Sequence, residues 1–186
     1  GIGDRCIDMI LEAISHSKKT TNRVARHSII HAQLANHSQI ERMKKLDVGA
    51  QTQPIFLNSD IPIIASRLGE RKEETYLFHT MYEKGIVTTI STDCPVEPLS
   101  PFKNLYCATT RKSIKHEELP GFILNEVFAL KDALKCYTEI PYYLSYDENT
   151  MYDDCIILNK EMTEENLLEL SVEEVIIDGK IVYTKK

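Results

Sequence analysis

Three strand-like runs in this sequence are separated by segments long enough to form helices. The first strand is expected over Ser28–Ala32, the second in "VGAQTQP" and the third in "IVTTIST". Between the first two, Ser38 and Glu41 form a capping-box pattern that opens a helix to about Leu46. Between the last two, "ERKEETYLFHTMYEKG" predicts a helix with Gly85 at a left-handed C-cap. Such alternation favours parallel βα units, in an open sheet or a (β/α) barrel.

Helices are also expected on both sides of these strands. Apolar residues at helical spacing predict a helix over Asp4–Lys19, with Asp4 as its cap. Two more helices are expected near Asn104–Lys112 and Asn125–Tyr137, whereas residues 54–69 have the composition of irregular chain. A barrel of eight βα units needs about 250 residues. Three units within residues 1–140 therefore predict either a small open sheet or part of a barrel.

The pattern changes after about Ile140. The run "CIILN" predicts a strand, and "EVIIDGKIVY" predicts two strands joined at Asp178-Gly179, a dipeptide typical of tight hairpins. We therefore expect two domains, an α/β body over residues 1–140 and a small antiparallel β appendage over residues 141–186.

Charge and cysteine usage limit the partners and the compartment. The formal net charge is -6 and no long basic run is present, so nucleic acid and anionic membranes are poor candidates as partners. No apolar run approaches the roughly 18 residues that a membrane span needs. The five cysteines are scattered and none forms a CxxC pair, a pattern typical of free thiols in a reducing compartment. A cytoplasmic location is therefore expected.

Polar residues follow the expected strands at the points where those strands end. His31 stands in "SIIHAQ", Asp93 in "TISTDCP", and Gln53 has a similar place on the middle strand. Because the carboxyl ends of parallel strands share one edge, these side chains are expected to converge, and a His and an Asp so placed can bind a divalent metal and activate water. The alternatives are a hydrogen-bonded structural histidine and an aspartate that only ends a strand before a turn. A nucleophilic Cys94 is disfavoured because no histidine stands at a suitable spacing.

Several stretches stand in a fixed order along the chain: "GIGDRCIDMILEAI", "RHSIIHAQL", "TQP", "STDCPV" and "VIIDGKIVY". Together they resemble the amidohydrolase superfamily, and more closely its subgroup of TIM-barrel metal-dependent hydrolases, which includes N-substituted formamide deformylases. The resemblance implies that His31 is a metal ligand at the end of the sixth barrel strand. It also implies that Asp93 closes the eighth strand, binds metal and shuttles the proton of the attacking water.

The resemblance covers most of the chain and implies an architecture. The expected fold is the C-terminal half of a (β/α)8 TIM barrel, about strands six to eight with their helices, followed by part of a composite β-domain. The other metal ligands, including a His directly before Gly1, are then expected in an N-terminal half that lies outside these residues. Two departures stand out: Ile30 replaces the family's acid, and the tail around "ENTMYDDCIILN" is shortened.

Two functions from different classes follow. In the first, the chain is part of a metal-dependent amidohydrolase that hydrolyses a non-peptide C–N bond of a small amide-type substrate. One or two divalent metals, zinc being expected, activate the water, and Asp93 acts as the general base and then as the general acid. The second is a non-catalytic fragment or pseudoenzyme that acts as a structural or interaction module. Since two ligands do not make a tight site, the isolated chain is expected to be inactive and can be free of metal. Open sheet edges predict a homodimer or pairing with the missing N-terminal half. A small open-sheet α/β protein without metal is a third, weaker alternative.

Overall fold

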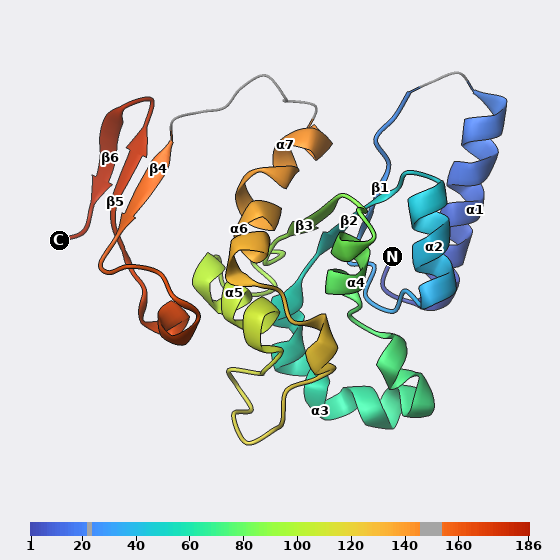
Figure 1. The fold of residues 1–186 in the computed structure, drawn as a ribbon, viewed down its shortest axis with the longest axis horizontal. Coiled ribbons are helices and arrows are strands. Elements are labelled where there is room, and N and C mark those ends of the chain that lie inside the picture. Colours follow the sequence, from blue (N-terminus) through green and yellow to red (C-terminus); the bar gives the residue numbers. More distant parts are fainter. Residues whose placement is uncertain (22–23, 146–153) are drawn as a thin grey trace.

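The fold is seen in a computed structural model that describes residues 1–21, 24–145 and 154–186 (Figure 1). It contains a three-stranded parallel sheet surrounded by helices and a three-stranded antiparallel sheet formed by the C-terminal residues. The α/β class with a parallel sheet and a small antiparallel sheet is therefore confirmed. None of the helices in these ranges is both long and apolar enough to cross a membrane.

The parallel sheet consists of β1 (Ser28–Ile30), β2 (Gly49–Thr52) and β3 (Thr88–Ile90), in that order. Ile29 pairs with Ala50, and Gln51 pairs with Thr89, so both strand pairs run parallel as the alternating pattern predicts. The first strand is shorter than expected because the backbone leaves the extended conformation directly after it. All three strands therefore end at one edge of the sheet.

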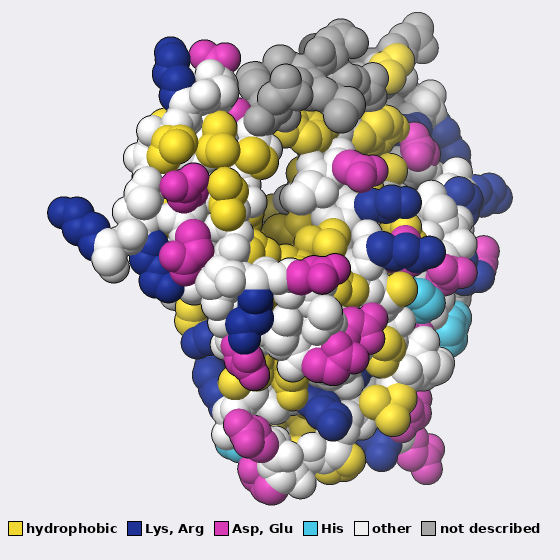
Figure 2. All heavy atoms as spheres, turned by 60° about the vertical axis from the view of Figure 1, so that its left-hand side comes forward, with side chains coloured by type: hydrophobic (Ala, Val, Ile, Leu, Met, Phe, Trp, Pro, Cys, Tyr) yellow, Lys and Arg dark blue, Asp and Glu magenta, His cyan; other side chains and the backbone are white. Residues whose placement is uncertain are grey.

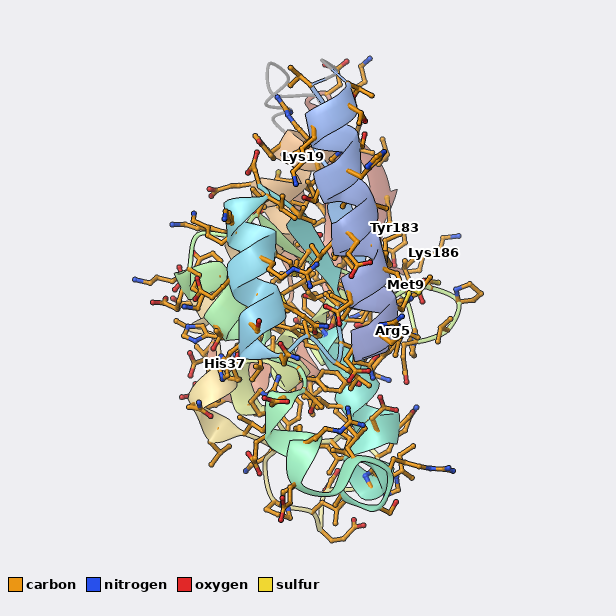
Figure 3. All side chains as sticks on the ribbon, turned by 90° about the vertical axis from the view of Figure 1, so that its right-hand side faces the viewer. Arg5, Met9, Lys19, His37, Tyr183 and Lys186 are labelled. Atoms are coloured by element: carbon orange, nitrogen blue, oxygen red, sulfur yellow. The ribbon has the colours of Figure 1, made fainter. Side chains whose placement is uncertain are left out.

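Helices α1 (Asp4–Thr20) and α2 (His37–Lys45) lie side by side next to the sheet (Figures 1 and 3). Helix α1 buries Ile7, Leu11 and Ile14 at helical spacing, whereas Met9 faces outward. Burying three aliphatic side chains of this size stabilises the fold by about 1.5–3 kcal/mol each, which fixes the helix on the sheet. The expected helix is therefore confirmed, including its amphipathic character.

The caps of these two helices differ from the expected ones. Helix α1 begins at Asp4, which follows the N-cap Gly3 and so is not itself the cap. Helix α2 has a capping box formed by Asn36 and Gln39, two residues earlier than the pattern of Ser38 and Glu41. The Asn36 side chain accepts a hydrogen bond from the Gln39 backbone at 2.9 Å, and the Gln39 side chain accepts from the Asn36 backbone at 3.1 Å. Both residue pairs fit the motif by sequence, and the earlier pair forms it.

Residues 54–69 are helical rather than irregular. A 3-10 turn over Pro54–Phe56 leads into α3 (Leu57–Leu68). Its composition, "LNSDIPIIASRL", is rich in residues that favour loops, and Pro62 lies inside the helix. Tertiary contacts override this local preference, because α3 buries Leu57 and Ile64 in the core.

The long helix expected in "ERKEETYLFHTMYEKG" is broken in the structure. A 3-10 segment over Gly69–Glu74 ends before Tyr76, whose φ is 56°, and only α4 (Phe78–Glu83) is a true α-helix. The left-handed residue at its C-terminal end is confirmed: Gly85 has φ 70°, and its N–H donates to the Tyr82 carbonyl at 2.8 Å.

Three helices follow the parallel sheet. They are α5 (Pro101–Thr110), α6 (Leu130–Thr138) and α7 (Ile140–Ser145), with a 3-10 turn over Leu124–Glu126 between the first two. Helix α5 begins earlier than expected, with Pro101 at its first position, where the missing N–H has no cost. Helix α6 contacts β3 at the far edge of the sheet from α1.

The antiparallel sheet confirms the expected strand and hairpin. It consists of β4 (Cys155–Leu158), β5 (Val172–Ile177) and β6 (Lys180–Thr184). Asp178 and Gly179 both have positive φ, as a type I′ turn requires. Exposed apolar side chains gather over this sheet, at the upper left of Figure 2; they are Ile156, Ile157, Ile177, Ile181, Val182 and Tyr183.

A 3-10 segment attaches this sheet to the rest of the molecule. It spans Glu164–Glu169 and packs against α5. Leu167 is fully buried, and Leu170 is nearly so; both belong to the same core as Ile29 and Phe102. Segments on both sides of residue 140 therefore share one hydrophobic core.

Candidate functional site

The carboxyl ends of the three parallel strands carry polar residues. His31 directly follows β1, Gln53 directly follows β2 and Ser91 directly follows β3. The sheet hydrogen bonds continue to these ends, because His31 N donates to the Gln51 carbonyl at 2.8 Å and Ser91 N donates to the Thr52 carbonyl at 2.9 Å. This is the edge at which parallel α/β proteins place functional groups.

The side chains at this edge form a row of hydrogen bonds. His31 Nδ1 lies 2.9 Å from Gln53 Oε1. The Gln53 amide nitrogen in turn donates to Ser91 Oγ at 3.0 Å and to the Gln51 carbonyl at 3.2 Å. Gln53 is only 2% exposed, so water has little access to these bonds. The row therefore links one residue from each strand end, as the sequence predicts for His31 and Gln53.

The backbone turns sharply at both residues that the sequence singles out. His31 has φ 73° and Asp93 has φ 54°, in the left-handed region that non-glycine residues seldom occupy. Such conformations cost on the order of 1–3 kcal/mol and cluster at functional sites. The His31 ring is also stacked on Phe56, with the ring centroids 5.9 Å apart and the planes 29° apart. The position of the imidazole is thus fixed by the backbone, by an aromatic neighbour and by Gln53.

Asp93 occupies the same edge but makes different contacts. Its side chain is exposed, and its carboxylate forms no hydrogen bond or ion pair with the part of the chain that the structure describes. Its backbone carbonyl accepts from Val96 N at 2.8 Å, which closes a turn that begins three residues after the end of β3. The structure therefore brings His31 and Gln53 into contact and leaves the Asp93 carboxylate open to a ligand.

The donor atoms at this edge suit a divalent metal, although they are too few for a complete site. An imidazole nitrogen and a carboxylate oxygen are usual ligands of zinc, and catalytic zinc sites have three protein ligands. Across residues 1–21, 24–145 and 154–186, no three His, Cys, Asp or Glu side chains come together in a group that could hold a metal ion. The described residues thus fit part of a metal site, with His31 and Asp93 as its candidates.

A buried asparagine connects the segments next to this edge, and no sequence pattern signals its role. Asn104 is fully buried in α5, and its Oδ1 accepts from Ile55 N at 2.8 Å. Its amide nitrogen donates to the Ser91 carbonyl at 2.6 Å and to the Tyr137 hydroxyl at 2.7 Å. One side chain therefore ties the segment after β2 and the end of β3 to helix α6. Ser91 could have been noticed as the polar residue that ends the third apolar run.

Comparison with known proteins decides the family. Residues 1–183 match the family model described as "Amidohydrolase family". The chain belongs to this family. It is 30% identical to "Putative amidohydrolase YtcJ" of Bacillus subtilis (strain 168) over 99% of its own length, and 23% identical to "N-substituted formamide deformylase" of Arthrobacter pascens over 100% of its length. The resemblance inferred from the sequence is confirmed.

Solved structures agree with the family assignment. A chain described as an uncharacterized metal-dependent hydrolase from Pyrococcus horikoshii OT3 superposes with a TM-score of 0.68 and 29% identity. This likeness covers 80% of the present chain and 29% of the other. The two curated amidohydrolase relatives are each covered over 36% of their length. The chain therefore spans about a third of the length of the curated family members it matches.

A second polar cluster lies beside the turn that follows His31 in this amidohydrolase-family chain. The Gln33 amide donates to Asp60 Oδ2 at 2.5 Å and to the Tyr76 hydroxyl at 2.7 Å, and that hydroxyl donates to Asp60 at 2.5 Å. Burial, and next the negative charge of Asp60, raise the pKa of Tyr76 well above its usual value. Tyr76 therefore remains a hydrogen-bond donor, and the cluster fastens the turn after β1 to α3.

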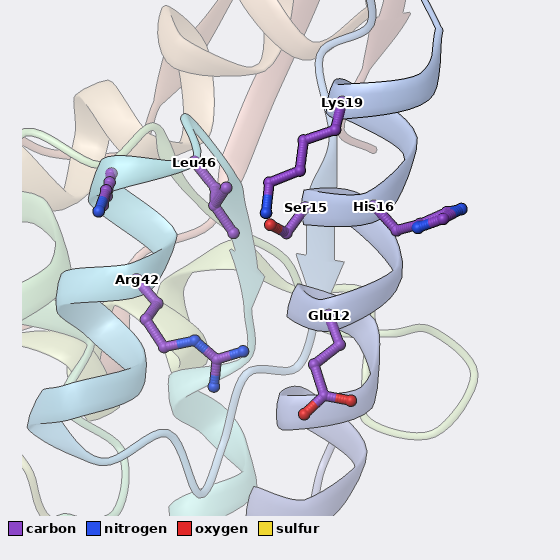
Figure 4. Close-up of a pocket in the computed structure, with 7 residues that line it drawn as sticks. Glu12, Ser15, His16, Lys19, Arg42 and Leu46 are labelled. Atoms are coloured by element: carbon purple, nitrogen blue, oxygen red, sulfur yellow. The ribbon is translucent and has the colours of Figure 1, made fainter.

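A hollow between α1 and α2 lies away from this site. It has a volume of about 360 Å³, and Figure 4 shows Lys19, Ser15 and Leu46 extending into the space between the helices while His16 points away. The lining residues come from the C-terminal halves of the two helices, and α2 leads directly into the start of β2. The hollow is thus near the amino ends of the strands. Basic residues such as Arg42 there stabilise the carboxyl ends of the helices, as the helix dipole requires.

Proposed function

We propose that this chain forms part of a metal-dependent amidohydrolase that hydrolyses a non-peptide C–N bond with metal-activated water. The observation that carries this proposal is the placement of His31 directly after β1 and of Asp93 three residues after the end of β3, at the carboxyl edge of a parallel sheet. Family membership supports the reaction class, and the solved relatives described as metal-dependent hydrolases support a metal. In this proposal His31 is a metal ligand, and Asp93 is both a ligand and the catalytic acid–base.

The proposal extends to the architecture. Strands β1, β2 and β3 are taken as strands six to eight of a (β/α)8 barrel, within a body of residues 1–140. Residues 141–186 are taken as part of a composite β-domain, whose other strands come from the N-terminal segment of family members. The parallel order of the strands and the TM-score of 0.68 support this assignment. The apolar side chains exposed on the antiparallel sheet support further strands against it.

The chemistry follows from the groups at the sheet edge. A divalent cation bound there, with zinc expected, supplies a Lewis acid and a water whose pKa is lowered to about 7. His31 provides a nitrogen ligand on a ring that Phe56 and Gln53 hold in place. The Asp93 carboxylate accepts a proton from the water while the oxygen of that water bonds to the carbonyl carbon of the substrate. It then donates this proton to the amine nitrogen as the C–N bond breaks.

The setting of the reaction is also part of the proposal. Each of the five cysteines is a free thiol, which supports a reducing, cytoplasmic location. The substrate is a small molecule with an amide-type bond, and the formamide deformylase among the relatives supports formamides as a starting panel. A second copy of the chain in a homodimer, or the N-terminal half that family members have in addition to these residues, covers the open edges of the parallel sheet.

A non-catalytic role is the second candidate. It is favoured by the observation that His31 and Asp93 do not join a third ligand within the described residues. In that case the chain acts as a structural or interaction module with an amidohydrolase-family fold. The catalytic function predicts bound metal and a loss of turnover in Asp93→Asn, whereas the non-catalytic function predicts neither.

The deciding experiment uses the full-length gene product, purified with zinc, and a panel of small amides that includes N-substituted formamides. The variant Asp93→Asn is expected to lower turnover by about 100-fold to 10,000-fold, the usual contribution of a general acid–base. Its matched control is Asp47→Asn, because Asp47 is exposed, has φ 51° and precedes β2 at the opposite end of the sheet.

Two results would contradict the proposals. Full-length protein that binds no metal and loses no turnover in Asp93→Asn would favour the non-catalytic role. The isolated chain of 186 residues is expected to be inactive. Stoichiometric zinc together with turnover in that chain would show that residues outside it are not needed.

A further inference from the structure

The orientation of the Gln53 side-chain amide is determined by its neighbours. One end of the amide lies 3.2 Å from the Gln51 backbone carbonyl oxygen, which can only accept a hydrogen bond. That end must therefore be the NH2 group, and it also donates to Ser91 Oγ at 3.0 Å. The other end, Oε1, then faces His31. This assignment follows from the hydrogen-bond network and requires no visible hydrogen atoms.

The reverse orientation of the amide is disfavoured by burial. It would place Oε1 against the Gln51 carbonyl oxygen, so that two acceptors would face each other. Gln53 is 2% exposed, so no bulk water is available to relieve this repulsion. An unpaired buried polar group costs about 1–3 kcal/mol, which is enough to select one orientation.

The amide orientation also determines the tautomer of His31. Gln53 Oε1 can only accept, so His31 Nδ1, at 2.9 Å, must carry the hydrogen. A neutral imidazole has one N–H, and the hydrogen bond at one nitrogen fixes the state of the other. Nε2 therefore keeps its lone pair. The backbone of Gln51 thus controls, through Gln53, which nitrogen of His31 is available to a ligand.

We propose that Gln53 is a positioning residue, which holds the His31 imidazole in the Nδ1–H tautomer so that Nε2 presents its lone pair to a divalent metal. The metal part of this inference rests on the proposed function, whereas the tautomer does not. Ligating histidines usually donate their second N–H to a carboxylate, a backbone carbonyl or water. Here a neutral side-chain amide takes that place, and the ring keeps its N–H because an amide oxygen does not take up the proton. Phe56 fixes the plane of the ring from one side.

The tautomer can be read directly by NMR of the 15N-labelled chain in alkaline buffer, where imidazoles are neutral. Long-range 1H–15N correlations distinguish the protonated ring nitrogen from the one with a lone pair, and the variant His31→Gln identifies the His31 signals. Wild-type His31 is expected as the Nδ1–H tautomer. In Gln53→Met, which keeps the volume and removes the acceptor, the Nε2–H form preferred by free histidine is expected to dominate.

The matched control is Gln51→Met on the same strand. The Gln51 side chain bonds to Ser28 Oγ at 2.7 Å, and the substitution leaves its backbone carbonyl in place. This variant is expected to keep the wild-type tautomer. A wild-type His31 in the Nε2–H form, or an unchanged tautomer in folded Gln53→Met, would overturn the proposal. If Gln53→Met does not fold, the wild-type spectrum decides, since it reads the tautomer without any substitution.

A titration of full-length protein with Co²⁺ separates this inference from the proposed function. Gln53→Met is expected to weaken Co²⁺ binding by about 10-fold to 100-fold, the usual effect of losing such a partner, and Gln51→Met is expected to leave it unchanged. Equal affinity in Gln53→Met and wild type would overturn the positioning role. If wild-type protein binds no Co²⁺ while its His31 has the Nδ1–H tautomer, the metal site fails and the control of the tautomer by Gln53 stands.

Discussion

Replacing Asn104 by leucine removes the side chain that joins three segments beneath the site. Leucine has the same branched arrangement of side-chain heavy atoms and no hydrogen-bonding groups, so the Ile55 N–H and the Ser91 carbonyl lose their partner at 2.8 and 2.6 Å. Asn104 is fully buried, so water does not replace these bonds. Each unpaired buried backbone group costs about 1–3 kcal/mol, which gives an expected loss of unfolding free energy of about 4 kcal/mol for two.

The assay is urea unfolding followed by circular dichroism, with the exposed neighbour Lys103→Leu as control. The control is expected to change the unfolding free energy by less than about 0.5 kcal/mol. The third bond of Asn104 is tested by Tyr137→Phe, for which about 1 kcal/mol is expected. A loss below about 1 kcal/mol in Asn104→Leu would refute the claim that this side chain joins the segments.

Three further predictions concern thiols and backbone. Cys107 and Cys136 should resist a thiol reagent in the native state, because burial raises the pKa of both to about 12, whereas the three exposed thiols should react. The pKa of Cys107 in the folded protein lies above its usual 9.0. The contribution of this thiol to the free energy of unfolding is therefore complete below about pH 9 and is lost as the pH rises toward 12. The variant Cys107→Ala should flatten this alkaline decline of stability in chemical unfolding. Gly85→Ala should destabilise the protein by about 1–2 kcal/mol in thermal unfolding, because its φ is 70°, whereas Gly3→Ala, with open space and ordinary φ, should cost less than this, its main loss being the poorer helix N-cap. Fast reaction of the buried thiols, an unchanged alkaline slope, or equal effects of the two glycine variants would contradict these expectations.

The sequence is informative where a residue's role depends on its place along a strand. The positions of His31 and Gln53 directly after their strands follow from apolar runs that stop at polar residues, because parallel strands share one carboxyl edge. The sequence also places Asp93 at a strand end, whereas β3 stops at Ile90 and Asp93 lies three residues further on. The hairpin at Asp178-Gly179 is predictable for a similar reason, since its turn needs positive φ at both positions.

The sequence is less informative where tertiary contacts decide. Helix α3 forms although Asn58, Ser59, Asp60 and Pro62 favour loops, because its apolar face is buried. The helical spacing of that face is visible in the sequence, but the loop-forming residues between its members obscure it; the residues of the face are Leu57, Ile61, Ile64 and Leu68. The capping box uses Asn36 although Ser38 fits the same motif. The partners of Asn104 are 49, 13 and 33 residues away, so its role is visible only once the chain is folded.

The central claim is that the carboxyl edge of this sheet holds a catalytic metal through His31 and Asp93. Its most direct test is anomalous diffraction at the zinc absorption edge from crystals of the full-length protein. The predicted result is a peak about 2.0–2.2 Å from His31 Nε2 and from an Asp93 carboxylate oxygen. Zinc bound elsewhere, or bound to His31 through Nδ1, would contradict it.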